Sequence, residues 1–383
     1  MKKIALIISS LTGGGAERVA INLCEYFNEQ YEDKLQCDLI VLNNTGDYIY
    51  HGPKHIINKN YNDKNLVKKI FYHWIGYRWK LARLKKKQDY DQVISFASLA
   101  NTLNLQTYGK EDTIVSVRNY LSLNLNARQK EQIKRHYQKA DKIIAVSKAC
   151  KQDLVDNFYL DEKKIEVIYN PYQIHKIQQA QAASIGGDSL YYKKKKTIIA
   201  VGRISRQKAF WRIIKAIAYL KEDDPEIRLL ILGKELNGQE ITHKLEALID
   251  AYHLHEQVHL LGFKSNPYAY VSRADLYVMS SLYEGFPNGM TEAMILGKPI
   301  ISVDCLSGPS EILHQGEYGI LIPQYAQDEH TQEITEGDIK IAQSIQKLLQ
   351  EPELLAHYEQ KSKQRGNDFL IDTIALQWLN LEV

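Results

Sequence analysis

The chain has 383 residues, a length at which one hydrophobic core usually stops growing, so two domains are expected. Hydrophobic residues make up 44% and charged residues 25%, with a net charge of +3, which is the composition of a globular protein and not of a disordered or fibrous one. The four cysteines are scattered without disulfide-framework or metal-ligand spacing, a pattern that indicates a reducing cytoplasm.

The N-terminus resembles a signal peptide at first sight, because Met1-Lys2-Lys3 precedes a short apolar run. Gly13 to Gly15 follow at once and no cleavage region is present, so residues 4–9 are predicted to form a buried strand. Residues 16–27 predict an amphipathic helix and residues 37–42 a second strand. No apolar run in the sequence approaches the ~18 residues that a membrane-spanning helix needs.

Residues 54–87 are strongly basic, with eleven Lys and Arg against one acid, Asp63, a local balance of +10 (11 − 1). Six aromatic residues are interleaved with these charges, among them Trp74 and Trp79. Basic residues with this many aromatics favour contact with an anionic membrane surface over a merely solvated face. Nucleic-acid binding is the competing interpretation, but nothing else in the chain resembles a DNA or RNA module.

Strands and helices continue to alternate along both halves of the chain, which predicts parallel βαβ units. Further strands are expected at 92–96, 113–117, 142–146, 165–168, 197–201, 228–232, 258–261, 276–279, 299–303 and 319–322. Helices are expected at 211–220, 243–252, 266–271 and 290–296, and from Gly337 the chain is helical to its end. A polar linker is expected between Pro171 and Lys196.

The fold class is therefore α/β, with two doubly wound Rossmann-like domains that face each other across a cleft. Residues 1–180 are expected to form the N-terminal domain and residues 190–365 the C-terminal domain. A helix in residues 366–383 is expected to return to the N-terminal domain. In open α/β sheets ligands bind at the carboxyl ends of the strands, so residues at those ends are the functional candidates.

Gly13 to Gly15 follow the first strand and precede the first helix. Glycines at this point let a ligand approach the backbone, and the helix start attracts an anion. A dinucleotide fingerprint is the rival interpretation, but Arg18 stands where the third glycine belongs and the second strand ends in Asn43-Asn44. NAD binding is therefore disfavoured, and a plain tight turn stays open.

Two cations follow the first strand of the second domain, in Val201-Gly202-Arg203 and at Lys208. Two cations at the carboxyl end of a strand can clamp a diphosphate and neutralise the charge of a departing nucleoside diphosphate. Further on, Glu284 and Glu292 lie eight positions apart across a Gly-Phe-Pro-Asn-Gly turn that opens a helix. The helix start suits a phosphate and the carboxylates suit sugar or ribose hydroxyls, although first-turn acids also stabilise helices on their own.

No metal site is indicated by the sequence. Asp89-Tyr90-Asp91 is the one Asp-x-Asp, and it precedes a strand, at the wrong end for a ligand, so it is interpreted as a turn. No His or Cys cluster has zinc spacing, and no Ser-His-Asp arrangement or nucleophile elbow is visible.

Together these motifs resemble the retaining glycosyltransferases of family 4, which have the two-domain architecture called GT-B. The similar stretches cover nearly the whole chain and are 11–18, 145–148, 170–171, 201–208, 284–292 and 308–311. The Glu-x7-Glu motif with its Gly-Phe-Pro insert is specific, and the combined set is more so.

The resemblance implies a role for each matched position. Arg203 and Lys208, after Gly202, would bind the diphosphate, Glu284 the donor sugar, and Glu292 the ribose. The loop and helix start that would hold the sugar and phosphate comprise Phe286, Pro287, Asn288, Gly289 and Thr291. Gly14 and Gly15 would lie near the donor phosphate and the acceptor.

The loop after residues 113–117 departs from the family pattern. Many relatives carry there a His that touches the donor sugar, whereas this chain has Ser116-Val117-Arg118-Asn119. Arg118 is the expected substitute in the catalytic set. The family needs no metal, in keeping with the missing Asp-x-Asp at the cleft, so no cofactor is expected.

The resemblance implies transfer of a hexose or N-acetylhexosamine from a nucleotide-diphosphate sugar, with UDP the favoured nucleotide. The acceptor is expected to be a lipid-linked or oligosaccharide glycan of a bacterial surface polymer such as capsule or lipopolysaccharide, at the inner face of the cytoplasmic membrane. A nucleotide-sugar epimerase of the same fold and a non-catalytic partner subunit are the alternatives. Neither the sugar, the linkage nor the oligomeric state follows from residue types.

Overall fold

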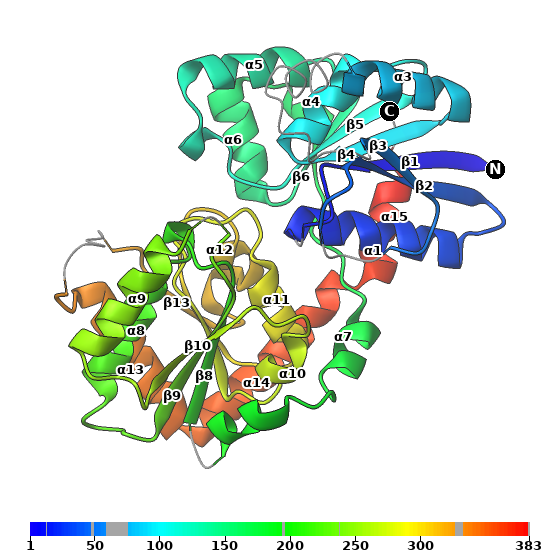
Figure 1. Ribbon diagram of the computed structural model, residues 1–383. Coiled ribbons are helices and arrows are strands. Elements are labelled where there is room, and N and C mark those ends of the chain that lie inside the picture. Colours follow the sequence, from blue (N-terminus) through cyan, green and yellow to red (C-terminus); the bar gives the residue numbers. More distant parts are fainter. Residues whose placement is uncertain are drawn as a thin grey trace. The chain divides into compact units, whose positions relative to one another are not determined.

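A computed structural model describes residues 1–12, 14–46, 50–58, 76–193, 196–236, 238–325 and 332–381. The chain packs into two units: unit 1 comprises Met1–Tyr172 and Phe369–Val383, and unit 2 comprises Gln173–Asp368. Each unit is a parallel sheet with helices packed against it (Figure 1). Within the ranges described, no helix combines the length and the apolar character that crossing a membrane requires.

The sheet of unit 1 has seven parallel strands in the order β3-β2-β1-β4-β5-β6-β7. The strands are β1 Lys2–Ile8, β2 Leu35–Asn43, β3 Lys54–Asn58, β4 Gln92–Phe96, β5 Asp112–Val117, β6 Lys142–Ala145 and β7 Ile165–Val167. The order reverses between β1 and β4, which defines a switch point where the loops after these two strands diverge. Central strands such as β4 are buried along their whole length because helices cover both faces.

Alternate residues of β1 supply two different cores, because successive side chains point to opposite faces of the sheet. Ile4, Leu6 and Ile8 belong to the core that includes α1 and Trp378, a residue near the end of the chain, whereas Ala5 and Ile7 belong to the core under α3. The helices of unit 1 are α1 Gly15–Gln30, α3 Tyr77–Gln88, α4 Ser98–Gln106, α5 Ala127–Tyr137, α6 Lys148–Phe158 and α15 Ile371–Leu379.

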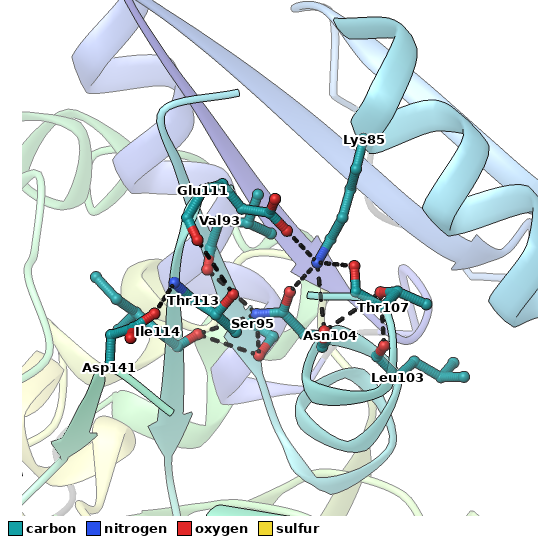
Figure 2. Close-up of polar contacts among 10 residues, drawn as sticks. All are labelled: Lys85, Val93, Ser95, Leu103, Asn104, Thr107, Glu111, Thr113, Ile114 and Asp141. Carbon is teal, nitrogen blue, oxygen red and sulfur yellow. Dashed lines mark hydrogen bonds and ion pairs between the residues drawn. The ribbon is translucent and has the colours of Figure 1, made fainter. Parts of the chain in front are cut away.

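A buried lysine joins α3 to the rest of unit 1 at the amino edge of the sheet (Figure 2). Lys85 lies on the same helix stripe as Tyr77 and Leu81, and its side chain is 4% exposed. Its amino group lies 2.8 Å from Glu111 Oε1 and donates to Asn104 Oδ1 at 2.7 Å and to the carbonyls of Asn104 and Thr107. Lys85 thus closes the C-terminal end of α4 and is unavailable to a surface ligand.

The sheet of unit 2 has six parallel strands in the order β10-β9-β8-β11-β12-β13. The strands are β8 Lys196–Val201, β9 Ile227–Leu232, β10 Val258–Gly262, β11 Leu276–Met279, β12 Ile300–Val303 and β13 Ile320–Ile322. The helices are α7 Ile174–Ala180, α8 Phe210–Leu220, α9 Glu240–Ala251, α10 Tyr268–Val271, α11 Asn288–Ile295, α12 Pro309–Ile312, α13 Glu336–Gln350 and α14 Pro352–Gly366. The order reverses between β8 and β11, the second switch point of the molecule.

The doubly wound α/β class expected from the sequence is confirmed, and the expected strands occur within two residues of their bounds. Two elements differ. β3 was not expected, because its Ile-Ile pair is flanked by polar residues and only its pairing with β2 reveals it. The expected linker between Pro171 and Lys196 contains α7, which packs on α10 and α11, so the division into units falls at Tyr172 rather than at 180.

Candidate active site

The motifs of the second half of the chain meet at the switch point of unit 2. Gly202 and Arg203 follow β8, and the segment from Ser280 to Pro287 follows β11, its direct neighbour. Because parallel strands end at the same edge, the two loops lie side by side at the carboxyl edge of the sheet. A third loop, from Asp304 to Gly308, follows β12 at this edge.

Lys208 and Glu284 form an ion pair at the centre of this edge. Lys208 Nζ lies 2.6 Å from Glu284 Oε1, and the two side chains are 18% and 8% exposed. The same two residues were predicted to bind a diphosphate and a sugar. Arg203 is exposed, and within the described part of the chain its side chain has no ion-pair partner.

Hydrogen bonds fasten the loop of Lys208 to the loop of Glu284. Ser280 Oγ donates to the carbonyls of Lys208 and Ala209 at 2.9 and 3.0 Å. Gln207 Nε2 donates to the carbonyl of Tyr283 at 2.8 Å, and Leu282 N–H donates to the carbonyl of Gln207 at 2.8 Å. These contacts hold the lysine and the carboxylate at a fixed separation before any ligand arrives.

The helix α11 begins beside this pair. Its N-cap residue is Pro287, whose ring has no atom that can accept a hydrogen bond from the first turn. The positive end of the helix therefore lacks a side-chain cap. Gly289, in the first turn, allows close packing: a Cβ there would lie 2.8 Å from Tyr277 Oη and 3.3 Å from the carbonyl oxygen of Val201. A larger residue would push the helix start away from the end of β8.

The loop after β12 supports the loop of Glu284 from the other side. Glu284 N–H donates to the carbonyl of Leu306 at 3.2 Å, and Ser307 Oγ donates to the carbonyl of Gly285 at 3.0 Å. Ser307 and Gly308 have φ values of +71° and +100°, and a Cβ on Gly308 would lie 2.7 Å from Pro287 Cδ. Ser307 therefore retains a left-handed conformation that side chains disfavour, a strain consistent with a functional loop.

The second carboxylate, Glu292, lies on α11 and is buried, as are Thr291 and Phe286. The hydroxyl of Tyr268, at the start of α10, donates to Glu292 Oε1 at 3.3 Å. Tyr268 was not predicted as a site residue, because a tyrosine in a four-residue helix has no signal that relates it to a carboxylate 24 positions later.

Buried groups beneath the two carboxylates stay protonated. Burial, with Glu284 and Glu292 nearby, raises the pKa of the Tyr277 phenol far above its usual range. Burial also raises the pKa of the Cys305 thiol, and the charge of Glu284 adds to this effect. Neither group supplies a proton acceptor, so the candidates for chemistry at this edge are Lys208, Glu284, Glu292, Arg203 and the start of α11.

Three predicted site residues belong to unit 1. Gly14 is the N-cap of α1 and Gly15 its first residue, whereas Gly13 lies outside the described residues. Arg118 directly follows β5 at the carboxyl edge, and its Nη1 donates to Ser116 Oγ at 3.2 Å. All three are thus at the ligand-binding edge of their own sheet.

Asp89 and Asp91 lie at the opposite edge. Asp89 is the left-handed C-cap of α3 and pairs with Lys110, and Asp91 accepts a hydrogen bond from Lys3 N–H. They form a turn, as expected. Over the described residues, no group of three or more His, Cys, Asp or Glu side chains could hold a metal ion.

Both units match models of known protein families. Residues 13–176 match the family described as Glycosyltransferase Family 4, and residues 185–365 match Glycosyl transferases group 1. A protein of Campylobacter jejuni, named N-acetylgalactosamine-N,N'-diacetylbacillosaminyl-diphospho-undecaprenol 4-alpha-N-acetylgalactosaminyltransferase, is 29% identical over 96% of both chains.

The fold is also found among solved structures. Anabaena HepE, solved in complex with UDP and glucose, superposes with a TM-score of 0.81 at 16% identity and covers 99% of this chain and 98% of its own. The lipopolysaccharide-biosynthesis glycosyltransferase WaaG superposes with a TM-score of 0.71 at 13% identity, over 98% of both chains.

Proposed function

This chain belongs to the family 4 glycosyltransferases and has the GT-B fold, and from that premise we propose a specific reaction. The enzyme transfers a hexose or N-acetylhexosamine from a UDP-sugar, with retention of configuration, to a lipid-linked or oligosaccharide acceptor in bacterial surface-glycan synthesis. The observation that carries this proposal is the Lys208–Glu284 ion pair beside the uncapped start of α11. The donor and acceptor classes are supported by HepE, which binds UDP, and by the Campylobacter relative, whose substrate is a diphospho-undecaprenol saccharide.

The proposed roles follow from charge and position. The bond between the anomeric carbon and the β-phosphate oxygen breaks, and its electron pair leaves with UDP. The acceptor oxygen then bonds to that carbon on the same face, and its proton passes to the departing β-phosphate oxygen of UDP. Arg203, Lys208 and the start of α11 stabilise the departing diphosphate, because cations and helix N-termini are strongest where negative charge develops. Glu284 orients the sugar and Glu292 accepts hydrogen bonds from the ribose hydroxyls.

The ion pair prepares the site for the donor. Glu284 fixes the direction of Lys208 while leaving two of the three ammonium hydrogens available, since Lys208 Nζ has no other hydrogen-bond partner among the described residues. A diphosphate can then join the pair without reorganising it. Preorganisation of this kind lowers the barrier to the departure of the leaving group.

We further propose that the enzyme works at an anionic membrane surface. Residues 59–75 of the basic segment lie outside the described residues, but α3 is described. Its exposed side bears five cations, Arg78, Lys80, Arg83, Lys86 and Lys87. Trp79 is 61% exposed beside them, with Arg83 over its ring. Cations with an exposed indole are suited to the headgroup region of an anionic leaflet.

The reaction is tested by nucleoside diphosphate release from a panel of UDP- and GDP-sugars, with and without a polyprenyl-diphosphate saccharide extract. We expect acceptor-dependent release from one UDP-sugar, lost in Glu284→Gln and unchanged in the exposed control Glu222→Gln. NMR of the product should show the anomeric configuration of the donor. Release without acceptor would favour the epimerase alternative, and UDP binding with no release would favour a non-catalytic subunit.

Arg203→Ala sharpens the assignment of the leaving-group site. Because its charge matters most as the diphosphate departs, we expect kcat to fall more than KM for the donor rises. Steady-state kinetics with the donor found above measure both parameters. An unchanged kcat would remove Arg203 from the catalytic set.

The membrane and cofactor proposals have separate tests. Binding to vesicles should rise with the fraction of anionic lipid and weaken at high salt. Replacing Arg78, Lys80 and Arg83 with Gln should weaken binding to anionic vesicles, and salt-resistant binding to neutral vesicles would contradict the proposal.

We also expect sugar transfer to persist in excess EDTA, and its loss would show that a divalent cation is required.

A further inference from the structure

Unit 1 contains a partly buried cation, Arg118, that the proposed donor site does not explain. Arg118 Nη1 donates to Ser116 Oγ, but Nη2 is buried and has no hydrogen-bond partner within the described ranges. An unsatisfied polar group on a charged side chain is costly, so its retention calls for a partner.

No carboxylate compensates this charge among the described residues. The ionisable groups that act on the guanidinium are the phenol of Tyr172 and the thiol of Cys150, and burial lowers the pKa of Arg118 to about 10. The nearby acid of α6, Asp153, is occupied elsewhere: its carboxylate accepts the N–H groups of Leu121 and Ser122 and the amide of Asn157. Among the residues whose structure is described, Arg118 thus remains a cation without a carboxylate counter-ion.

A second positive element lies at the same place. β5 and β6 are paired through Val117 and Ala145, and Val146 N–H donates to the carbonyl of Val117, so the chain beyond Arg118 runs beside the start of α6. This helix has eleven residues and begins after Ser147, whose Oγ accepts from Cys150 N–H. A buried guanidinium and a helix N-terminus at one strand edge repel each other unless an anion joins them.

We propose that Arg118 and the start of α6 form an oxyanion subsite in unit 1 that binds a phosphate group of the acceptor. The proposal rests on the function proposed above, in which Arg203, Lys208 and α11 of unit 2 already take the diphosphate of the donor. A guanidinium fork donates to two charged phosphate oxygens at once, whereas a sugar hydroxyl offers it a single neutral acceptor oxygen, which compensates a buried cation less well. Arg118 is therefore assigned to the acceptor phosphate and not to the donor sugar.

The experiment measures binding of inorganic pyrophosphate to the full chain by calorimetry, with saturating UDP present to fill the donor site. We expect wild type to bind one pyrophosphate and Arg118→Gln to bind it about tenfold or more weakly, because a charged hydrogen-bonding partner is lost. Arg118→Lys should recover part of the affinity. Arg135→Gln, a surface arginine of the same unit, should match wild type.

The affinity for UDP separates this proposal from the proposed function. Arg118→Gln should bind UDP within about twofold of wild type, while the KM for a polyprenyl-diphosphate saccharide rises about tenfold. Weaker UDP binding with unchanged pyrophosphate binding would assign Arg118 to the donor and overturn the proposal. Absence of pyrophosphate binding by wild type would also overturn it, whether or not UDP binds.

Thermal unfolding distinguishes a ligand site from a structural arginine. Removing an uncompensated buried charge should leave the Tm unchanged or raise it, and pyrophosphate should raise the Tm of wild type but not of Arg118→Gln. A large fall in Tm on substitution would show that Arg118 stabilises the fold, which would contradict the proposal.

Discussion

Two Lys–Glu pairs in this protein have nearly the same separation and different surroundings. Lys85 and Glu111 lie 2.8 Å apart at the amino edge of the sheet of unit 1, whereas Lys208 and Glu284 lie 2.6 Å apart at the carboxyl edge of the sheet of unit 2. Lys85 also donates to three oxygens of α4 and its C-terminal end, while Glu284 is the one hydrogen-bond partner of Lys208 in the described part of the chain. The ammonium group of Lys85 has partners for all of its hydrogens, which suits a role in stability. That of Lys208 has hydrogens left over, which suits binding of a ligand.

The lysine with more hydrogen-bond partners is also the more deeply buried of the two. Lys85 is 4% exposed and Lys208 is 18% exposed, so water reaches only the second to a useful degree. Burial lowers the pKa of Lys85, and Glu111 offsets part of this effect. In the proposed function the first pair is structural and the second binds the donor, in keeping with the tendency of ligands to bind at the carboxyl edge of a parallel sheet.

The largest effect is expected from Lys85→Met. This change leaves Glu111 buried without its cation and removes the donor from the end of α4, at a cost of about 3–5 kcal/mol. Urea unfolding of unit 1 measures the loss. The neighbouring exposed lysine provides the control, since Lys86→Met should change stability by less than about 0.5 kcal/mol. Similar losses of stability in Lys85→Met and Lys86→Met would show that the buried hydrogen bonds of Lys85 contribute little to the fold.

Lys208→Met should act on turnover instead. We expect kcat to fall about 10²–10³-fold, because a charge that stabilises the departing diphosphate is lost. The loss of stability should be at most about half of that for Lys85→Met, since Lys208 is more exposed and makes fewer hydrogen bonds. Kinetics and urea unfolding of the same preparation measure both. Equal destabilisation with normal turnover would make the second pair structural.

The smallest effect is expected from Tyr268→Phe. Loss of one hydrogen bond to Glu292 should weaken UDP binding about two- to tenfold, corresponding to about 0.5–1.5 kcal/mol, with kcat nearly unchanged. Calorimetric titration with UDP measures the affinity, and the exposed Tyr219→Phe serves as a control. A fall in kcat without a change in affinity would contradict a role for Tyr268 in positioning Glu292.

The sequence predicted the strands well because most are apolar runs covered on both faces, a local signal. It also predicted that Lys208 and Glu284 both belong to the site, Lys208 because it follows a predicted strand end and Glu284 because it precedes a turn that opens a helix. Their direct contact was not predictable, since the residues are 76 positions apart and only the pairing of β8 with β11 brings them together.

Other features of the structure have little or no sequence signal. Lys85 stands in a run of three lysines that reads as solvated, and only its spacing from Tyr77 and Leu81 on one stripe of α3 hints at burial. The left-handed conformation of Ser307 is equally hidden, because serine ordinarily avoids it and the contact with Gly285 comes from a different loop. Tertiary contacts between loops decide both cases.

The last described helix has a consequence for biosynthesis. α15 belongs to unit 1, where Trp378 is completely buried and its ring lies 5.5 Å from that of Phe96. Unit 2 is one continuous segment, whereas unit 1 needs residues from both sides of it. During translation the second unit can therefore complete its core first, while the first waits with an apolar surface that a ribosome-associated chaperone would recognise, until Trp378 has been synthesised.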